Sequence, residues 1–124
     1  MRLTRFDGSY AVARMGPAAS VPDGILDGPG FRTVSRTEDE LSVVCPEGAL
    51  SDADKIDGGW ACFKLHGPFA FDEVGIVAGL SRTLADRKIG IFVISTFDTD
   101  YILVKQDYAD AAAAAWRESG HQVD

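Results

Sequence analysis

The sequence lacks a long apolar run and has few cysteines. No apolar stretch approaches the roughly 20 residues that a membrane-spanning helix needs, and the first residues are charged with no apolar run behind them. We therefore expect neither a membrane segment nor a secretory signal. Cys45 and Cys62 lie within apolar runs and lack metal-ligand spacing. We expect buried, reduced thiols in a cytoplasmic protein, rather than a disulfide.

Histidines and catalytic motifs are equally scarce. The only two histidines are His66, which ends an expected strand, and His121, near the last residue. No Gly-x-Ser-x-Gly or phosphate-loop pattern occurs, although a catalytic triad can be hidden in a sequence. We predict that the chain is not an enzyme, with no catalytic residue and no cofactor.

Basic residues are outnumbered by acidic ones, 12 to 19, which gives a net charge of −7. Binding to nucleic acid depends on neutralising phosphates with Lys and Arg, and anionic membranes attract basic segments. Both partners are therefore disfavoured. The 124 residues, 46% of them hydrophobic, suit one compact domain or two small ones.

The first half of the chain predicts a strand followed by a hairpin. Ser9–Met15 is an expected strand, and Pro17–Gly30 is so rich in Pro and Gly that it holds at most a short helix. Phe31–Ser35 and Leu41–Cys45 alternate or concentrate apolar residues as strands do. Residues 51–59 look like a linker because Ser, Asp and Gly are plentiful there.

The second half predicts a strand at Trp60–His66 and then a helix. Asp72 is the expected N-cap, and Ile76, Leu80 and Leu84 form one helical stripe.

A hairpin and a last helix follow. Ile89–Thr96 is so apolar that we expect a central strand covered on both faces, with Tyr101–Lys105 as its hairpin partner. Asp107 is the expected N-cap of the last helix, and Gly120 its left-handed C-cap. Its expected buried stripe comprises Tyr108, Ala112, Ala115 and Trp116.

An internal repeat is the most informative pattern. Strand and turn positions of the first hairpin match the second at an offset of 60, so that Glu38 falls on Asp98 and Glu40 on Asp100. The preceding Gly-Pro pairs match at an offset of 51. Each repeat is a strand, a helix region and two strands, with the helix truncated in the first. We predict an α+β fold of two tandem ferredoxin-like repeats, with antiparallel sheets and helices on one face. The first repeat would span 1–50, the linker 51–59 and the second repeat 60–124.

Two segments carry a resemblance to a known family. They are Ser35–Glu47 and Ile91–Val104, the second preceded by Gly58–Trp60 and a Gly-Pro pair at Gly67. Together they resemble the small bacterial ACT-domain proteins, which are related to CASTOR-type arginine sensors and to the regulatory part of aspartate kinases. The resemblance implies tandem ACT folds, a cytoplasmic setting, a homodimer and sensing of a free amino acid.

A ligand carboxylate would suit the start of the helix after Asp72, since helix N-termini present free amides and a partial positive charge. Gly75 costs that helix roughly 1 kcal/mol relative to Ala. Close approach of a ligand to the backbone would explain why a glycine stands at this position, and so would a simple turn. The candidate ligand-binding residues here are Asp72, Val74, Gly75 and Ile76.

A ligand ammonium would need the acceptors of the second hairpin turn, where related sensors bind their ligands. The candidates are Ser95, Thr96, Asp98 and Asp100, and one aspartate would pair with the side chain of a basic ligand. The alternative is that both aspartates only shape the turn. Two carboxylates without a positioned histidine make an incomplete metal site, so we expect no metal.

Two main functions remain open from the sequence, and an unrecognised hydrolase is a third, minor one. The first is an amino-acid-binding regulatory module whose ligand stabilises one quaternary arrangement. The alternative is a protein–protein interaction module that dimerises through its sheet without a small ligand.

Overall fold

The computed structural model describes residues 1–67 and 74–124, which form two compact units. The N-terminal unit is Gly8–Trp60, and the C-terminal unit combines Met1–Asp7 with Ala61–Asp124. The predicted boundaries differ at two places. The first residues contribute strand β1 (Arg2–Arg5) to the C-terminal unit, and Lys55–Leu65 is strand β5, so residues 55–59 are not a linker. Strand β5 supplies its first half to one unit and its second half to the other.

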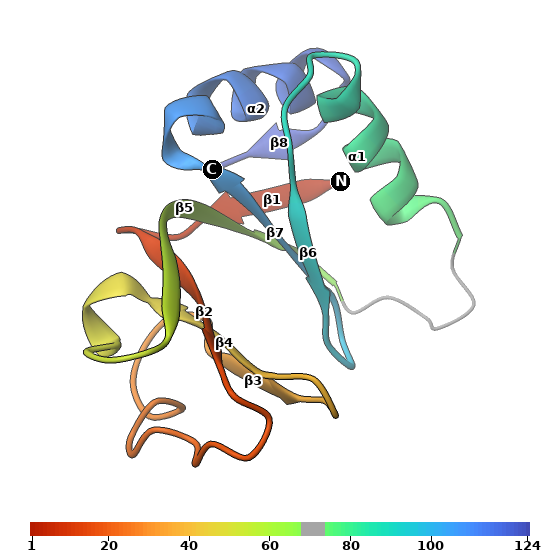
Figure 1. The fold of residues 1–124 in the computed structure, drawn as a ribbon. Coiled ribbons are helices and arrows are strands. Elements are labelled where there is room, and N and C mark those ends of the chain that lie inside the picture. Colours follow the sequence, from red (N-terminus) through yellow and green to blue (C-terminus); the bar gives the residue numbers. More distant parts are fainter. Residues whose placement is uncertain (68–73) are drawn as a thin grey trace. The chain divides into compact units, whose positions relative to one another are not determined.

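The C-terminal unit has a sheet in the order β8-β1-β5-β7-β6 (Figure 1). Strand β1 runs antiparallel to β5 and parallel to β8 (Gln122–Val123), while β6 (Phe92–Ser95) and β7 (Asp100–Lys105) form an antiparallel hairpin. Helices α1 (Ile76–Ala85) and α2 (Gln106–Glu118) pack on one core with the strands. The predicted α+β, ferredoxin-like arrangement with helices on one face is confirmed.

Helix α1 uses the predicted apolar stripe. Leu80 and Leu84 are fully buried, and Ile76 packs against the same core. The residue before the helix is Gly75, with φ of 81° and no side-chain cap. The predicted N-cap, Asp72, lies outside the described residues.

Helix α2 begins one residue before its predicted N-cap, so Asp107 lies in the first turn. Ala112, Ala115 and Trp116 are buried as predicted, but Tyr108 is 53% exposed. Trp116 Nε1 donates a hydrogen bond of 3.1 Å to the Leu80 carbonyl, and its ring meets Phe63 edge-on at 5.0 Å. Gly120 has a φ of 95°, as its predicted capping role requires.

Strand β6 is shorter than predicted and is an edge strand, not a central one. Among the described strands it pairs with β7 alone. Its apolar run arises because Val93 and the preceding Ile91 pack on the helix-covered core, while alternate side chains lie on the other face.

The N-terminal unit has a sheet in the order β3-β4-β2-β5. Its strands are β2 (Tyr10–Met15), β3 (Thr33–Arg36), β4 (Leu41–Pro46) and the start of β5, and a short 3₁₀ helix, η1, covers Glu47–Ala49. Segment 16–32 forms turns rather than a helix, anchored by the buried Ile25. The two cysteines are free and buried, as predicted.

The hairpins of the two units are built alike, at an offset of 59 residues. In the first, Thr37 N and Oγ1 both donate to the Glu40 carbonyl. In the second, Thr96 N and Oγ1 donate to the Thr99 carbonyl in the same way. The predicted offset of 60 is therefore wrong by one residue, because the threonine hydroxyl, rather than the acidic residues, defines the turn.

The preceding strands differ from the predicted alignment by the same amount. Strand β2 ends at Met15 and β5 at Leu65, an offset of 50 rather than 51. Burial agrees, because Arg14 lies between two buried residues of β2 as Lys64 does in β5. This alignment pairs Arg14 with Lys64 and Asp39 with Asp98.

Candidate ligand site

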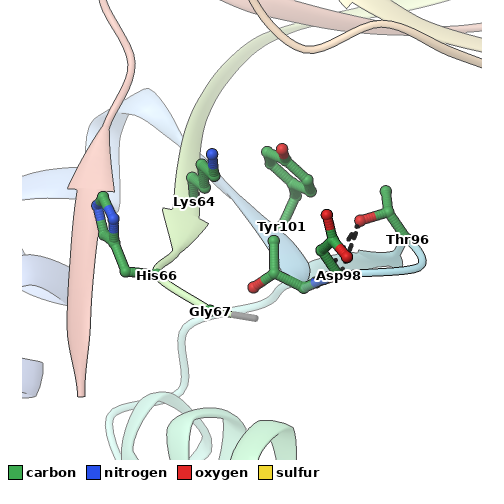
Figure 2. A pocket seen from close by; sticks show the side chains of 7 residues that line it. Lys64, His66, Gly67, Thr96, Asp98 and Tyr101 are labelled. Carbon is green, nitrogen blue, oxygen red and sulfur yellow. Dashed lines mark hydrogen bonds between the residues drawn. The ribbon is translucent and has the colours of Figure 1, made fainter. Parts of the chain in front are cut away.

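A pocket of about 220 Å³ lies in the C-terminal unit, where the end of β5 meets the β6–β7 turn (Figure 2). It is smaller than the roughly 300–1,000 Å³ of pockets for drug-sized ligands, so it suits a molecule the size of a free amino acid. Its lining is mainly polar and charged. The lining residues are Lys64, His66, Gly67, Thr96, Asp98, Thr99 and Tyr101.

Strand alternation carries the basic residues into this pocket. Phe63 and Leu65 face the helix-covered core, so Lys64 and His66 lie on the opposite face of β5. In Figure 2, Lys64 and Tyr101 project to the same side from the neighbouring strands β5 and β7. The pocket therefore opens on the sheet face that the helices leave uncovered.

The turn is fixed by two threonines. Thr96 Oγ1 donates a hydrogen bond of 3.0 Å to the Thr99 carbonyl, which closes the turn. Thr99 Oγ1 donates one of 2.7 Å to the Leu65 carbonyl at the end of β5. Thr99 is only 7% exposed, so this bond is shielded from water. The two bonds fix the position of Asp98 at the pocket rim.

Lys64 and Asp98 contribute opposite charges to the lining. Neither takes part in an ion pair among the described residues. Within the described part of the chain, one ammonium and one carboxylate thus remain without an ionic partner in a single pocket. Such a pair is complementary to the carboxylate and ammonium of a zwitterion.

The remaining lining groups are hydrogen-bonding groups. His66 Nε2 lies 2.5 Å from Thr4 Oγ1, which fixes the imidazole ring. Burial, assisted by the nearby Cys62 and Asp98, raises the pKa of Tyr101 above its ordinary value. The shift moves the phenol further from ionisation, so it is protonated at neutral pH.

The structure brings together two of the eight predicted residues, Thr96 and Asp98. Ser95 and Asp100 are opposite each other in the hairpin, and the serine hydroxyl donates to the carboxylate. They support the turn without lining the pocket.

The predicted helix-start residues do not line the pocket. Val74 is 91% exposed, and Gly75 and Ile76 begin α1 outside the lining set. A Cβ at Gly75 would meet nothing within 4 Å, so its positive φ, rather than crowding, explains the glycine. Asp72 lies outside the described residues.

Sequence reasoning missed five lining residues: Lys64, His66, Gly67, Thr99 and Tyr101. A signal was present in Phe63-Lys64-Leu65-His66, where polar residues alternate with apolar ones just before a strand ends. The strand was predicted, but its polar face was not connected with the distant turn.

The described residues include no group of three or more His, Cys, Asp or Glu side chains placed to hold a metal ion. None of the helices in ranges 1–67 and 74–124 is long and apolar enough to cross a membrane.

A ferredoxin-like α+β sheet with helices on one face is the fold of ACT domains. Residues 55–118 match the family model of the ACT domain, and the chain belongs to that family. A second model, described as an N-terminal domain, matches residues 8–53. The two matched ranges correspond closely to the two units.

Known proteins agree with this assignment. A crystal structure of an Agrobacterium tumefaciens protein shares 41% identity and a TM-score of 0.90, covering 99% of this chain and 91% of that chain. The human cytosolic arginine sensor for mTORC1 subunit 1 is 43% identical over 49 residues, which are 39% of this chain but only 15% of the sensor. The aspartokinase alpha and beta subunits share the fold, with a TM-score of 0.65 at 17% identity, covering 95% of this chain and 96% of that chain.

Proposed function

We propose that the protein is a regulatory module that binds a free amino acid in the pocket between the end of β5 and the β6–β7 turn. The observation that carries the proposal is the placement of Lys64 and Asp98 in one small pocket without ionic partners among the described residues. Family membership supports a regulatory role over a catalytic one.

In this proposal each end of the amino acid has a partner. The Lys64 ammonium binds the α-carboxylate and the Asp98 carboxylate binds the α-ammonium, both through charge-assisted hydrogen bonds. The Thr96 hydroxyl donates its proton within the turn, so toward the ligand it would act as an acceptor for the α-ammonium. Gly67 lets the ligand approach the backbone closely, because it has no side chain.

The module would regulate by population shift. A ligand that binds one quaternary arrangement better than another stabilises that arrangement by its differential affinity. We propose a cytoplasmic homodimer as the regulated form, since the family resemblance implies both. The N-terminal unit would be a reduced first repeat, supported by its equivalent hairpin.

One observation favours the alternative of an interaction module. Phe97, at the tip of the β6–β7 turn, is 78% exposed. An apolar ring at this position would suit contact with a partner protein. If the protein is an interaction module, replacing Phe97 with Ser would weaken its association with the partner protein. If it is an amino-acid-binding module, the same replacement would leave ligand binding unchanged.

A thermal-shift screen of the intact chain against the twenty free amino acids tests the proposal. A ligand that binds the native state at about 100 times its Kd adds about 2.7 kcal/mol to the free energy of unfolding. The Asp98→Asn variant should lose the response. Asp39→Asn, the equivalent position in the N-terminal hairpin, is the matched control and should keep it. A flat response of the unmodified protein to all twenty would refute the proposal.

A further inference from the structure

We propose that Thr4, on strand β1, is a positioning residue of the ligand pocket and acts through His66. This inference rests on the proposed function, since it concerns the same pocket. His66 lines the pocket, whereas Thr4 is not among the lining residues. Three features of the contact between β1 and the end of β5 support the proposal.

The strand register places Thr4 on the pocket face of the sheet. Leu3 of β1 is directly opposite Leu65 of β5, and both are fully buried in the helix-covered core. Side chains alternate along a strand, and directly opposite residues share a face. The next pair, Thr4 opposite Lys64, therefore lies on the other face, where the pocket opens. His66 follows Lys64 by two residues on that face, in the position diagonal to Thr4.

A hydrogen bond joins the side chains of Thr4 and His66. Thr4 Oγ1 lies 2.5 Å from His66 Nε2, and both residues are partly buried. In Figure 2 the imidazole ring lies beside β1, away from Asp98. A hydroxyl both donates and accepts, whereas Nε2 does one or the other according to the state of the ring. The bond is therefore compatible with either tautomer and with either charge of His66.

The backbone of His66 is fixed to the same strand. His66 N donates a hydrogen bond of 2.9 Å to the Arg2 carbonyl. On the other side of β5, Thr99 Oγ1 donates to the Leu65 carbonyl. Strands β1 and β7 are the two neighbours of β5 in this unit. The end of β5 is thus held from both sides, by β1 and by the β6–β7 turn.

A pocket wall that is held in place before binding favours binding. Ordering a mobile side chain when a ligand arrives costs free energy, and a ring that is already fixed avoids this cost. Without the Thr4 hydroxyl, the imidazole of His66 gains rotamer freedom. We expect the affinity for the amino acid to fall by about two- to tenfold, the equivalent of one side chain that must be ordered.

The ring signals of the free protein test the positioning without any ligand. The chain has two histidines, His66 and His121, so His66→Ala assigns the ¹H–¹³C spectrum of the imidazoles. Thr4→Val keeps the branched shape and removes the hydroxyl, and it should shift the His66 signals but not those of His121. Thr4→Ser keeps the hydroxyl and should resemble the unmodified protein. Unchanged His66 signals in Thr4→Val would overturn the inference.

Calorimetric titration of the full chain tests the consequence for binding, with the amino acid that gives the largest thermal shift as the probe. Thr4→Val should bind it about two- to tenfold more weakly, whereas Thr4→Ser should retain the affinity. Thr33→Val, at a partly buried strand threonine of the N-terminal unit, is the matched control and should bind normally. Thr4→Ala also lacks the hydroxyl and repeats the test if the valine variant does not fold.

A double-mutant cycle shows whether Thr4 acts through the imidazole. In a His66→Ala background, Thr4→Val should cause no further loss, because residues that act together are not additive. An equal loss in both backgrounds, or no loss in either, would overturn the role of Thr4 and leave the proposed function standing. No response of the unmodified protein to any of the twenty amino acids would refute the proposed function, and this role with it.

Discussion

The Thr99 hydroxyl donates a hydrogen bond of 2.7 Å to the carbonyl oxygen of Leu65, 34 residues earlier in the chain. This bond joins the β6–β7 turn to the end of β5, and so joins the two parts of the chain that line the pocket. Because Thr99 is buried, the bond is protected from competition by water.

Replacing Thr99 with Val keeps the shape of the side chain and removes this donor. The buried Leu65 carbonyl then lacks its partner, which should cost about 1–3 kcal/mol of the free energy of unfolding. Urea denaturation measures the change. Thr83→Val removes an exposed helix hydroxyl that bonds to the Gly79 carbonyl and should cost well under 1 kcal/mol. Equal losses in the two variants would show that the Thr99 bond is not specially protected.

Trp116 holds α2 against α1 through its bond to the Leu80 carbonyl. Trp116→Ala should therefore lower the free energy of unfolding by about 3–5 kcal/mol. Tyr108→Ala, at a half-exposed position on the same helix, should change it by about 0.5 kcal/mol or less. A small effect at Trp116 in denaturant unfolding would contradict the described packing of the two helices.

Gly75 precedes α1 in a left-handed conformation. Gly75→Ala should destabilise the protein by about 1–2 kcal/mol because a Cβ is strained at positive φ, and Gly75→Asn should cost less because Asn tolerates that conformation. Ligand affinity should change in neither variant, since Gly75 does not line the pocket. Loss of affinity without loss of stability would support the helix-start site that the sequence predicts.

Cys62 is fully buried, and burial raises the pKa of its thiol to about 12. Because the pKa is higher in the folded state than in the unfolded state, this group stabilises the fold fully at low pH. Its contribution is lost as the pH rises from about 9 to about 12. In a Cys45→Ala background, labelling of Cys62 by a thiol reagent at pH 8 should be slow in the native state and fast in urea. Rapid native labelling would contradict the burial.

The sequence was sufficient to predict those elements whose periodicity is set by one buried face. Leu80 and Leu84 repeat every four residues and mark α1, and the concentration of apolar residues in Leu41–Cys45 marks β4. Strand β1 was missed because its short segment, Arg2–Arg5, has a single buried apolar residue, Leu3, and is held by pairing with β5 and β8. Such non-local pairing leaves no periodic pattern in a four-residue strand.

Two of the seven lining residues, Thr96 and Asp98, were predictable for a related reason. Thr96 and Asp98 belong to one turn with a local hydrogen-bonding pattern, which sequence reasoning detects. Lys64 and His66 join them only because β5 pairs with β7, and nothing local to β5 indicates that pairing. The one-residue error in the repeat alignment also hid the equivalence of Lys64 and Arg14.

Binding of an amino acid between the end of β5 and the β6–β7 turn is the basis of the proposed function. A titration of the ¹⁵N-labelled protein with the amino acid that gives the largest thermal shift, followed by amide chemical shifts, tests it most directly. We predict that the largest saturable shifts fall on Lys64–Gly67 and Thr96–Tyr101, with little change at the equivalent turn, Thr37–Glu40. Largest shifts at Gly75–Val77 or at Thr37–Glu40, or no saturable shift at all, would contradict the account.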